Sequence, residues 1–268
     1  MTEADDAPIR YSMRTHVGKV RSANEDAVIG LPEHQLWAVS DGMGGHKNGA
    51  YASNAIVEAL GALSPSLPAG ELMQSARDAV LEAHETILAE SARNGGATIG
   101  ATVVMLLISA GHFACLWAGD SRLYKLSDGK LQRVSRDHSL VADLVEAGHL
   151  TDEEAENHPH SNVITRAVGV GEVLEVDKRI GRVGRGDRFL LCSDGLTKYA
   201  NDALLEEVLQ TEPIETISER LLQIALDGGG ADNISVIVVE LGEDEADSLT
   251  QADTERTVVP GAPSGGGL

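Results

Sequence analysis

Five acidic positions in this sequence lie at the end of a short apolar run. Asp41 ends "LWAVSD" and Asp194 ends "FLLCSD", and glycine follows each of them. The other positions are the Glu25-Asp26 pair before "AVIG", Asp120 between two apolar runs, and Asp232 before "NISVIVV". A single Asp-Gly pair is ordinary turn chemistry. The repeated pattern is more constraining, because it predicts several carboxylates at the tips of buried strands.

The order of apolar runs predicts an α+β fold. Strands are expected at 10–15, 27–30, 36–40, 97–109, 173–180, 188–193 and 234–240, with short strands from 112 to 134 around a hairpin at Asp128-Gly129. Helical spacing of apolar residues appears at 50–63, 71–93, 202–209 and 214–226. Clustered strands and paired helices favour an α-β-β-α sandwich of two mostly antiparallel sheets flanked by helix pairs.

The chain is expected to form one domain over residues 9–241. A loose leader covers residues 1–8, and a polar insert without a long apolar run covers about 137–170. The segment 242–268 is acidic and then rich in glycine and proline, which is typical of disorder.

Composition excludes several classes of protein. The formal net charge of −21 argues against binding to nucleic acid or an anionic membrane. No apolar run reaches the roughly 18 residues of a membrane span. The two cysteines, Cys115 and Cys192, lie in separate apolar runs, which favours buried thiols in a reducing cytoplasm. Aromatic residues make up only 3%, so the core must be mainly aliphatic.

If the acids converge at one end of a sandwich, they must be protonated, spread apart or neutralised by cations. Two like charges ~4 Å apart repel by ~4 kcal/mol at an effective dielectric constant of ~20. Oxygen ligands without Cys or His at ligand spacing select hard ions such as Mg²⁺ or Mn²⁺. Gly42 after Asp41 would allow its own carbonyl to approach an ion.

The glycines after Asp41 do not form a nucleotide-binding loop. Gly44 and Gly49 match the start of GxxxxGK[ST], but Ala50 and Tyr51 stand where that motif requires Lys and Ser/Thr. In the GxGxxG pattern, Lys47 occupies the last glycine position.

Six motifs together resemble the metal-dependent protein phosphatases of the PP2C (PPM) family. They are "GKVRSANEDA", "DGMGGH", "GATVV", "GDSRLY", "SDGL" and "GGGADNISVIVV", in the family's order from about residue 15 to 240. The resemblance is strongest to bacterial serine/threonine phosphatases that oppose Ser/Thr kinases, including those tied to protein-secretion gene clusters. The family fold is a β-sandwich flanked by helices, which agrees with the fold expected from the apolar pattern.

The resemblance implies two catalytic Mn²⁺ or Mg²⁺ ions and a third ion seen in bacterial members. By this resemblance Asp41 bridges the two catalytic ions, Gly42 lends its carbonyl to one, and Asp194 and Asp232 complete the first site.

The outer acids have separate implied roles. Glu25 and Asp26 would hold metal-bound waters, while Asp120, with Asp194, would form the third site. Arg21 would bind the substrate phosphate, a task that suits its planar fork of donors, and the polar insert would be the flap beside the active site.

One departure concerns the general acid. Many eukaryotic members carry His directly after the Asp-Gly of the first metal motif, whereas this sequence has Met43, which cannot donate a proton. His46 is a candidate acid, an exposed loop histidine without a catalytic task is the alternative, and a metal-bound water could act instead.

The implied activity is hydrolysis of phosphoserine and phosphothreonine in proteins by a metal-bridging water. The expected partners are phosphorylated proteins and a Ser/Thr kinase, and a monomer is expected. Two alternatives stay open: a catalytically idle module that binds phosphoproteins, and a phosphatase of small metabolites.

Overall fold

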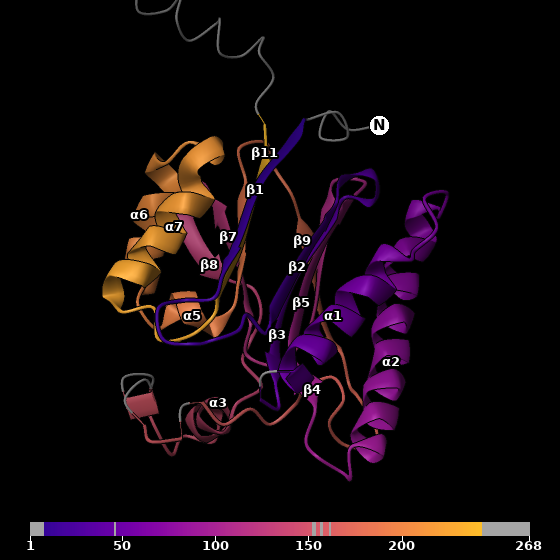
Figure 1. Cartoon of the computed structure of the whole chain (residues 1–268). Coiled ribbons are helices and arrows are strands. Elements are labelled where there is room, and N and C mark those ends of the chain that lie inside the picture. The colour runs from indigo at the N-terminus through magenta and orange to yellow at the C-terminus, as the bar shows by residue number, and fades with distance from the viewer. Residues whose placement is uncertain (1–7, 46, 152–153, 156–157, 161, 243–268) are drawn as a thin grey trace, which may run out of the picture.

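The structure is a computed structural model that describes residues 8–45, 47–151, 154–155, 158–160 and 162–242. Two β-sheets pack face to face, and helices cover the outer face of each, as Figure 1 shows. The α-β-β-α sandwich predicted from the sequence is therefore confirmed.

The first sheet is antiparallel and has the strand order β1-β11-β10-β7-β8. Its strands are β1 (Ile9–His16), β11 (Ile234–Leu241), β10 (Arg188–Cys192), β7 (Arg122–Ser127) and β8 (Lys130–Arg133). Every residue of β11 is buried, including Ser235 and Glu240, and its mainly apolar sequence is that of a strand covered on both faces. The β7–β8 connection has positive φ at both Asp128 and Gly129, so the predicted hairpin is present.

The second sheet follows the order β2-β3-β5-β6-β9, with β4 paired to the end of β3. Its strands are β2 (Asp26–Leu31), β3 (Leu36–Met43), β4 (Gly100–Ala101), β5 (Val103–Ser109), β6 (His112–Ala118) and β9 (Asp177–Arg182), with the 3-10 helix η2 (Pro32–His34) between β2 and β3. The sequence predicted one strand over 97–109, but the structure divides it at Thr102, whose N–H donates to the Asp41 carbonyl at 2.8 Å. The strand expected at 173–180 begins later, at Asp177.

The helices form two groups. On the second sheet lie α1 (Lys47–Gly61) and α2 (Ala69–Arg93), and on the first lie α5 (Asp194–Thr197), α6 (Asp202–Thr211) and α7 (Ile214–Gly228), as seen in Figure 1. The Asn201 side chain caps α6 by accepting from the Leu204 N–H. The insert carries α3 (Leu140–Glu146), which lies beyond one end of the sandwich (Figure 1). Among the residues described, no helix is both long and apolar enough to cross a membrane.

The core has three apolar layers, one under each helix group and one between the sheets. The layers under the helices are mainly aliphatic, as the composition predicted. Both tryptophans and both phenylalanines of the chain lie in the layer between the sheets. There Phe113 and Phe189 pack edge to face with ring centroids 5.2 Å apart.

We expect Phe189→Ala to lower the free energy of unfolding by about 3–5 kcal/mol, because it would leave a cavity between the two sheets. Denaturant unfolding with a chelator present would measure this loss. Val173→Ala is the control, since Val173 is 80% exposed, and it should have little effect. An equal loss in both variants would contradict this account of the core.

Candidate metal centre

Asp26 and Asp41 come together through the pairing of β2 with β3. The register of this ladder sets Asp26 directly opposite Asp41. Residues opposite each other in an antiparallel pair have Cα atoms about 4.5–5.5 Å apart and point to the same face. Two acids that are 15 positions apart in the sequence thus become neighbours.

Asp194 and Asp232 come together on the other sheet in the same way. Asp194 follows β10 and Asp232 precedes β11, and these two strands are paired. The ladder extends past its last pair, because the Ser193 N–H donates to the Ser235 carbonyl at 3.0 Å. The Lys198 ammonium lies between the two acids, 2.8 Å from Asp194 Oδ2 and 3.0 Å from Asp232 Oδ2.

Hydrogen bonds hold the ends of the two sheets to each other. The Ser193 hydroxyl, next to β10, donates to Asp26 Oδ2 at 2.8 Å. The Asn233 side chain accepts from the Glu25 N–H at 2.8 Å and donates to the carbonyls of Val17 and Ala23. The acids of both sheets therefore meet at one end of the sandwich.

Asp120 reaches the same end from the crossing between β6 and β7, where the chain passes from one sheet to the other. The neighbouring Ser121 hydroxyl lies 2.7 Å from Thr102 Oγ1, which accepts from the Asp41 N–H at 3.0 Å. This chain of polar contacts ties the crossing to the end of β3.

The glycines after Asp41 have a steric reason that the sequence did not reveal. A Cβ on Gly42 would collide with the carbonyl of Gly49, and a Cβ on Gly49 would collide with the Glu25 carboxylate. The Gly42 N–H donates to the Glu25 carbonyl at 3.1 Å. The first turn of α1 therefore packs against β3 and Glu25 at a distance that only glycine permits.

The buried acids carry strongly perturbed pKa values. Burial, and then the charges of Asp194 and Asp232, raise the pKa of Asp26 to about 7, although bonds from Ser193 and Ser235 oppose this. Burial, followed by Asp194 and Asp137, raises the pKa of Asp120 to about 7.

The Asp41 carboxyl is repelled by several neighbouring acids. Burial raises the pKa of its carboxyl well above the usual value, and the charges of Asp26, Asp194, Asp120 and Asp232 add to the effect. Four acids that act on one carboxyl show that the site is crowded with negative charge.

Asp232 behaves in the opposite way because basic side chains contact it. Burial tends to raise its pKa, but Lys198 and Arg21 lower the pKa of this carboxyl below its usual value. Arg21 grips it with Nε 2.9 Å from Oδ1 and Nη2 3.0 Å from Oδ2. The side chain of Arg21 is 52% exposed, so it forms the open rim of the site.

The donor set fits a divalent cation. Asp26 Oδ1 and Asp194 Oδ1 are buried and lack a hydrogen-bond partner, which is costly unless a cation approaches. All the candidate donors are oxygens, which hard ions prefer. In the part of the chain that the structure describes, no three His, Cys, Asp or Glu side chains form a ready ligand set. The Lys198 ammonium instead occupies the position between Asp194 and Asp232.

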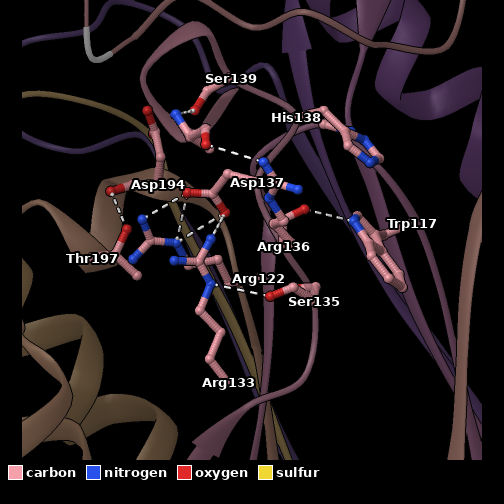
Figure 2. A network of polar contacts seen from close by, with 12 residues as sticks. Trp117, Arg122, Arg133, Ser135, Arg136, Asp137, His138, Ser139, Asp194 and Thr197 are labelled. Carbon is pink, nitrogen blue, oxygen red and sulfur yellow. Dashed lines mark hydrogen bonds and ion pairs between the residues drawn. The ribbon is translucent and has the colours of Figure 1, made fainter. Parts of the chain in front are cut away.

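A second charged cluster holds the start of the polar insert at about 137–170, the predicted flap. Figure 2 shows Asp137 between Arg122 and Arg133, with an ion pair to each and the Arg122 Nη2 atom 2.8 Å from Asp137 Oδ2. The Trp117 indole N–H donates to the Arg136 carbonyl at 2.7 Å. The flap therefore starts from a fixed point between the sheets.

The other end of the flap is held separately. Val168 forms a bridge with Ala101, and the Gly169 N–H donates to His84 Nδ1 on α2 at 2.9 Å. Ala101 is paired with Gly42, so the flap contacts the strand that carries Asp41.

The structure brings together most of the predicted site residues. They are Arg21, Glu25, Asp26, Asp41, Gly42, Asp120, Asp194 and Asp232. His46 lies outside the described residues, and Met43 pairs with Gly100 of β4. Lys198 is not among the residues predicted from the sequence, although its spacing of four residues from Asp194 is that of a helical ion pair.

The sequence model of the protein phosphatase 2C family matches residues 16–231, and the chain belongs to this family. Serine/threonine protein phosphatase PstP of Mycobacterium tuberculosis is 36% identical over 87% of this chain, which spans only 45% of the length of that relative. Serine/threonine phosphatase stp of Listeria monocytogenes is 35% identical over 85% of this chain and 94% of its own.

Solved structures agree in fold. PppA, a key regulatory component of T6SS in Pseudomonas aeruginosa, is 40% identical and superposes with a TM-score of 0.80 over 87% of this chain and 97% of its own. The catalytic domain of PstP in complex with 2 manganese ions is 35% identical, with a TM-score of 0.80 over 88% of this chain and 99% of its own.

We expect Asp26→Asn to stabilise the metal-free protein more at pH 8 than at pH 5. The pKa of Asp26 is raised from 3.8 to about 7, so the folded state binds a proton more tightly than the unfolded state. Stability is then lost as the pH rises through this window, by up to about 1.4 kcal/mol per pH unit.

The thermal midpoint in a chelator, measured for both proteins from pH 5 to pH 8, would test this prediction. Comparing the two proteins cancels the contributions of other titrating groups. Asp128→Asn, in the exposed β7–β8 turn, is the control. A gap between Asp26→Asn and the parent protein that does not widen with pH would contradict the prediction.

Proposed function

We propose that this chain is a metal-dependent protein phosphatase that hydrolyses phosphoserine and phosphothreonine. The observation that carries the proposal is the convergence of acids from β2, β3, β10, β11 and the β6–β7 crossing at one end of the sandwich. Membership of the protein phosphatase 2C family supports it, and so do relatives named as serine/threonine phosphatases.

The proposed ligands of Mn²⁺ or Mg²⁺ are the Asp41, Asp194 and Asp232 carboxylates and the Gly42 carbonyl. Glu25 and Asp26 would hold water around two ions, and Asp120 with Asp194 would hold a third. The buried, unpartnered oxygens of Asp26 and Asp194 support this assignment.

Bound divalent ions would supply Lewis acidity and an activated water to the reaction. Arg21 would leave Asp232 and bind two oxygens of the substrate phosphoryl group, for which its planar fork is suited. Water adds to phosphorus, keeps one proton on the phosphate product and releases the other, while the bond from phosphorus to the serine or threonine oxygen breaks and that oxygen takes up a proton. His46 is the proposed side-chain donor of this proton, since Met43 has none to give.

The proposed partners are phosphorylated proteins and the Ser/Thr kinase that produces them. Cys115 and Cys192 are free and buried, which fits a reducing cytoplasm. The phosphatase and its kinase would act in this compartment. Neither thiol is available as a nucleophile, because burial raises the pKa of Cys192 to about 12 and that of Cys115 higher still.

The idle-module alternative is disfavoured by the completeness of the acid set. A module that had lost catalysis would have no need to keep several buried carboxylates in mutual repulsion. The metabolite alternative concerns the substrate alone, and rates on two substrates separate it from the proposal.

The direct test is hydrolysis of a phosphothreonine peptide and of a sugar phosphate, each with Mn²⁺ and with excess chelator. We expect turnover of the peptide only with the metal, and a much lower kcat/KM on the sugar phosphate. Peptide turnover that survives full chelation would reject metal dependence, and a preference for the sugar phosphate would reject the substrate class.

We expect Asp41→Asn and Asp232→Asn to lower kcat on the peptide by at least about 10²–10³-fold, the usual cost of losing one preorganised electrostatic group. Circular dichroism should show that both variants are folded. Asp128→Asn makes the same chemical change in the exposed β7–β8 turn and should keep full activity. Parental rates in either site variant would reject its assignment as a ligand.

A further inference from the structure

Lys198 contacts the candidate centre but has no place in the chemistry proposed so far. It follows the short helix α5 and is four residues beyond Asp194. Its ammonium lies 2.8 Å from an oxygen of Asp194 and 3.0 Å from an oxygen of Asp232. The side chain is 29% exposed, so it is largely shielded from water.

These two contacts are the ones that a divalent ion would need. Asp194 and Asp232 are the pair proposed to complete one metal site, and they flank two different strands, β10 and β11. The single positive charge of Lys198 now bridges them. An ion that binds the same oxygens must displace this ammonium.

We propose that Lys198 is a tethered counterion that neutralises Asp194 and Asp232 in the metal-free protein and weakens the binding of divalent ions by competing for these carboxylates. The inference rests on the metal centre proposed above. It concerns the affinity of that centre and adds no step to the hydrolysis.

Two effects of Lys198 lower the affinity of the site for divalent ions. Before binding, Lys198 stabilises the metal-free state by reducing the repulsion between Asp194 and Asp232. After a divalent ion binds, the displaced ammonium is still held near the site by the Lys198 side chain, so it repels the bound cation. Removing the charge of Lys198 should therefore favour the metal-bound state in both respects.

Replacing Lys198 could also weaken metal binding, if the Asp194 and Asp232 carboxylates lost their fixed positions. The fold limits this opposing effect. The β10–β11 ladder positions both acids, and the Ser193 N–H continues this ladder. The Asn233 N–H donates to Asp232 Oδ1 at 3.0 Å. Neither carboxylate depends on Lys198 alone for its position.

The first test is titration calorimetry of Mn²⁺ into the metal-free protein and into Lys198→Met, which keeps the length of the side chain without its charge. We expect Lys198→Met to bind Mn²⁺ about two- to fivefold more tightly, the scale of one partly exposed ion pair, and to melt at a lower temperature without metal. Lys198→Arg keeps the charge and should stay near the parent protein. Lys130→Met removes the same charge from an exposed position on β8 and should not change the Kd.

The second test uses the unmodified protein and does not depend on the folding of a variant. An amine-reactive reagent with detection by mass spectrometry should label Lys198 slowly without metal, because two carboxylates enclose the ammonium. Saturating Mn²⁺ should increase this labelling several-fold and leave Lys130 unchanged.

The outcomes separate this inference from the proposal on which it rests. If the parent protein binds no Mn²⁺, the proposed metal centre fails. If the parent binds Mn²⁺ but Lys198→Met binds it equally or more weakly, or if the labelling of Lys198 does not respond to Mn²⁺, the role of Lys198 is overturned and the centre stands.

Discussion

Repulsion between carboxylates is the constraint on which the rest of this structure depends. Asp26 lies directly opposite Asp41, and charges from both sheets act on Asp41. Because burial removes the water that would otherwise screen these charges, the repulsion persists over several ångströms. The molecule counters it locally with the hydroxyl of Ser193 and the ammonium of Lys198. The arrangement of donors and cations at this end of the sandwich is a response to the acids.

The strand ladders make this repulsion unavoidable. The register of β2 with β3 sets one pair of acids, and the pairing of β10 with β11 sets the other. A slip of one residue would turn a carboxylate to the opposite face and move each apolar side chain of the strand into the wrong layer of the core. The free energy gained from the aliphatic and aromatic core therefore also keeps the charges together. Packing between the sheets, far from any substrate, positions the site.

The sequence predicted the features that depend on local pattern. An apolar run that ends in Asp41 or Asp194 specifies both a buried strand and an acid at its tip, and the Asp128-Gly129 pair specifies a hairpin. Features set by tertiary pairing escaped prediction. The break at Thr102 lies where side chains replace a ladder bond, because the Ser40 hydroxyl donates to the Thr102 carbonyl and the Asp41 N–H donates to Thr102 Oγ1. Glycine is required at position 42 because the first turn of α1 packs there. Neither partner is adjacent in the sequence.

The charge left unbalanced is unevenly distributed over the site. Asp137 at the base of the flap is paired with two arginines, and Asp194 and Asp232 share Lys198. Within the described part of the chain, Asp26, Asp41 and Asp120 have no ion pair of this kind, and these are the acids whose pKa values are raised. A cation that enters the site therefore gains most next to Asp41, where the repulsion of the other acids converges. Lys198 and Arg21 already neutralise acids at the edge of the site, which weakens the attraction for a divalent ion there. The attraction is therefore strongest at the centre of the site.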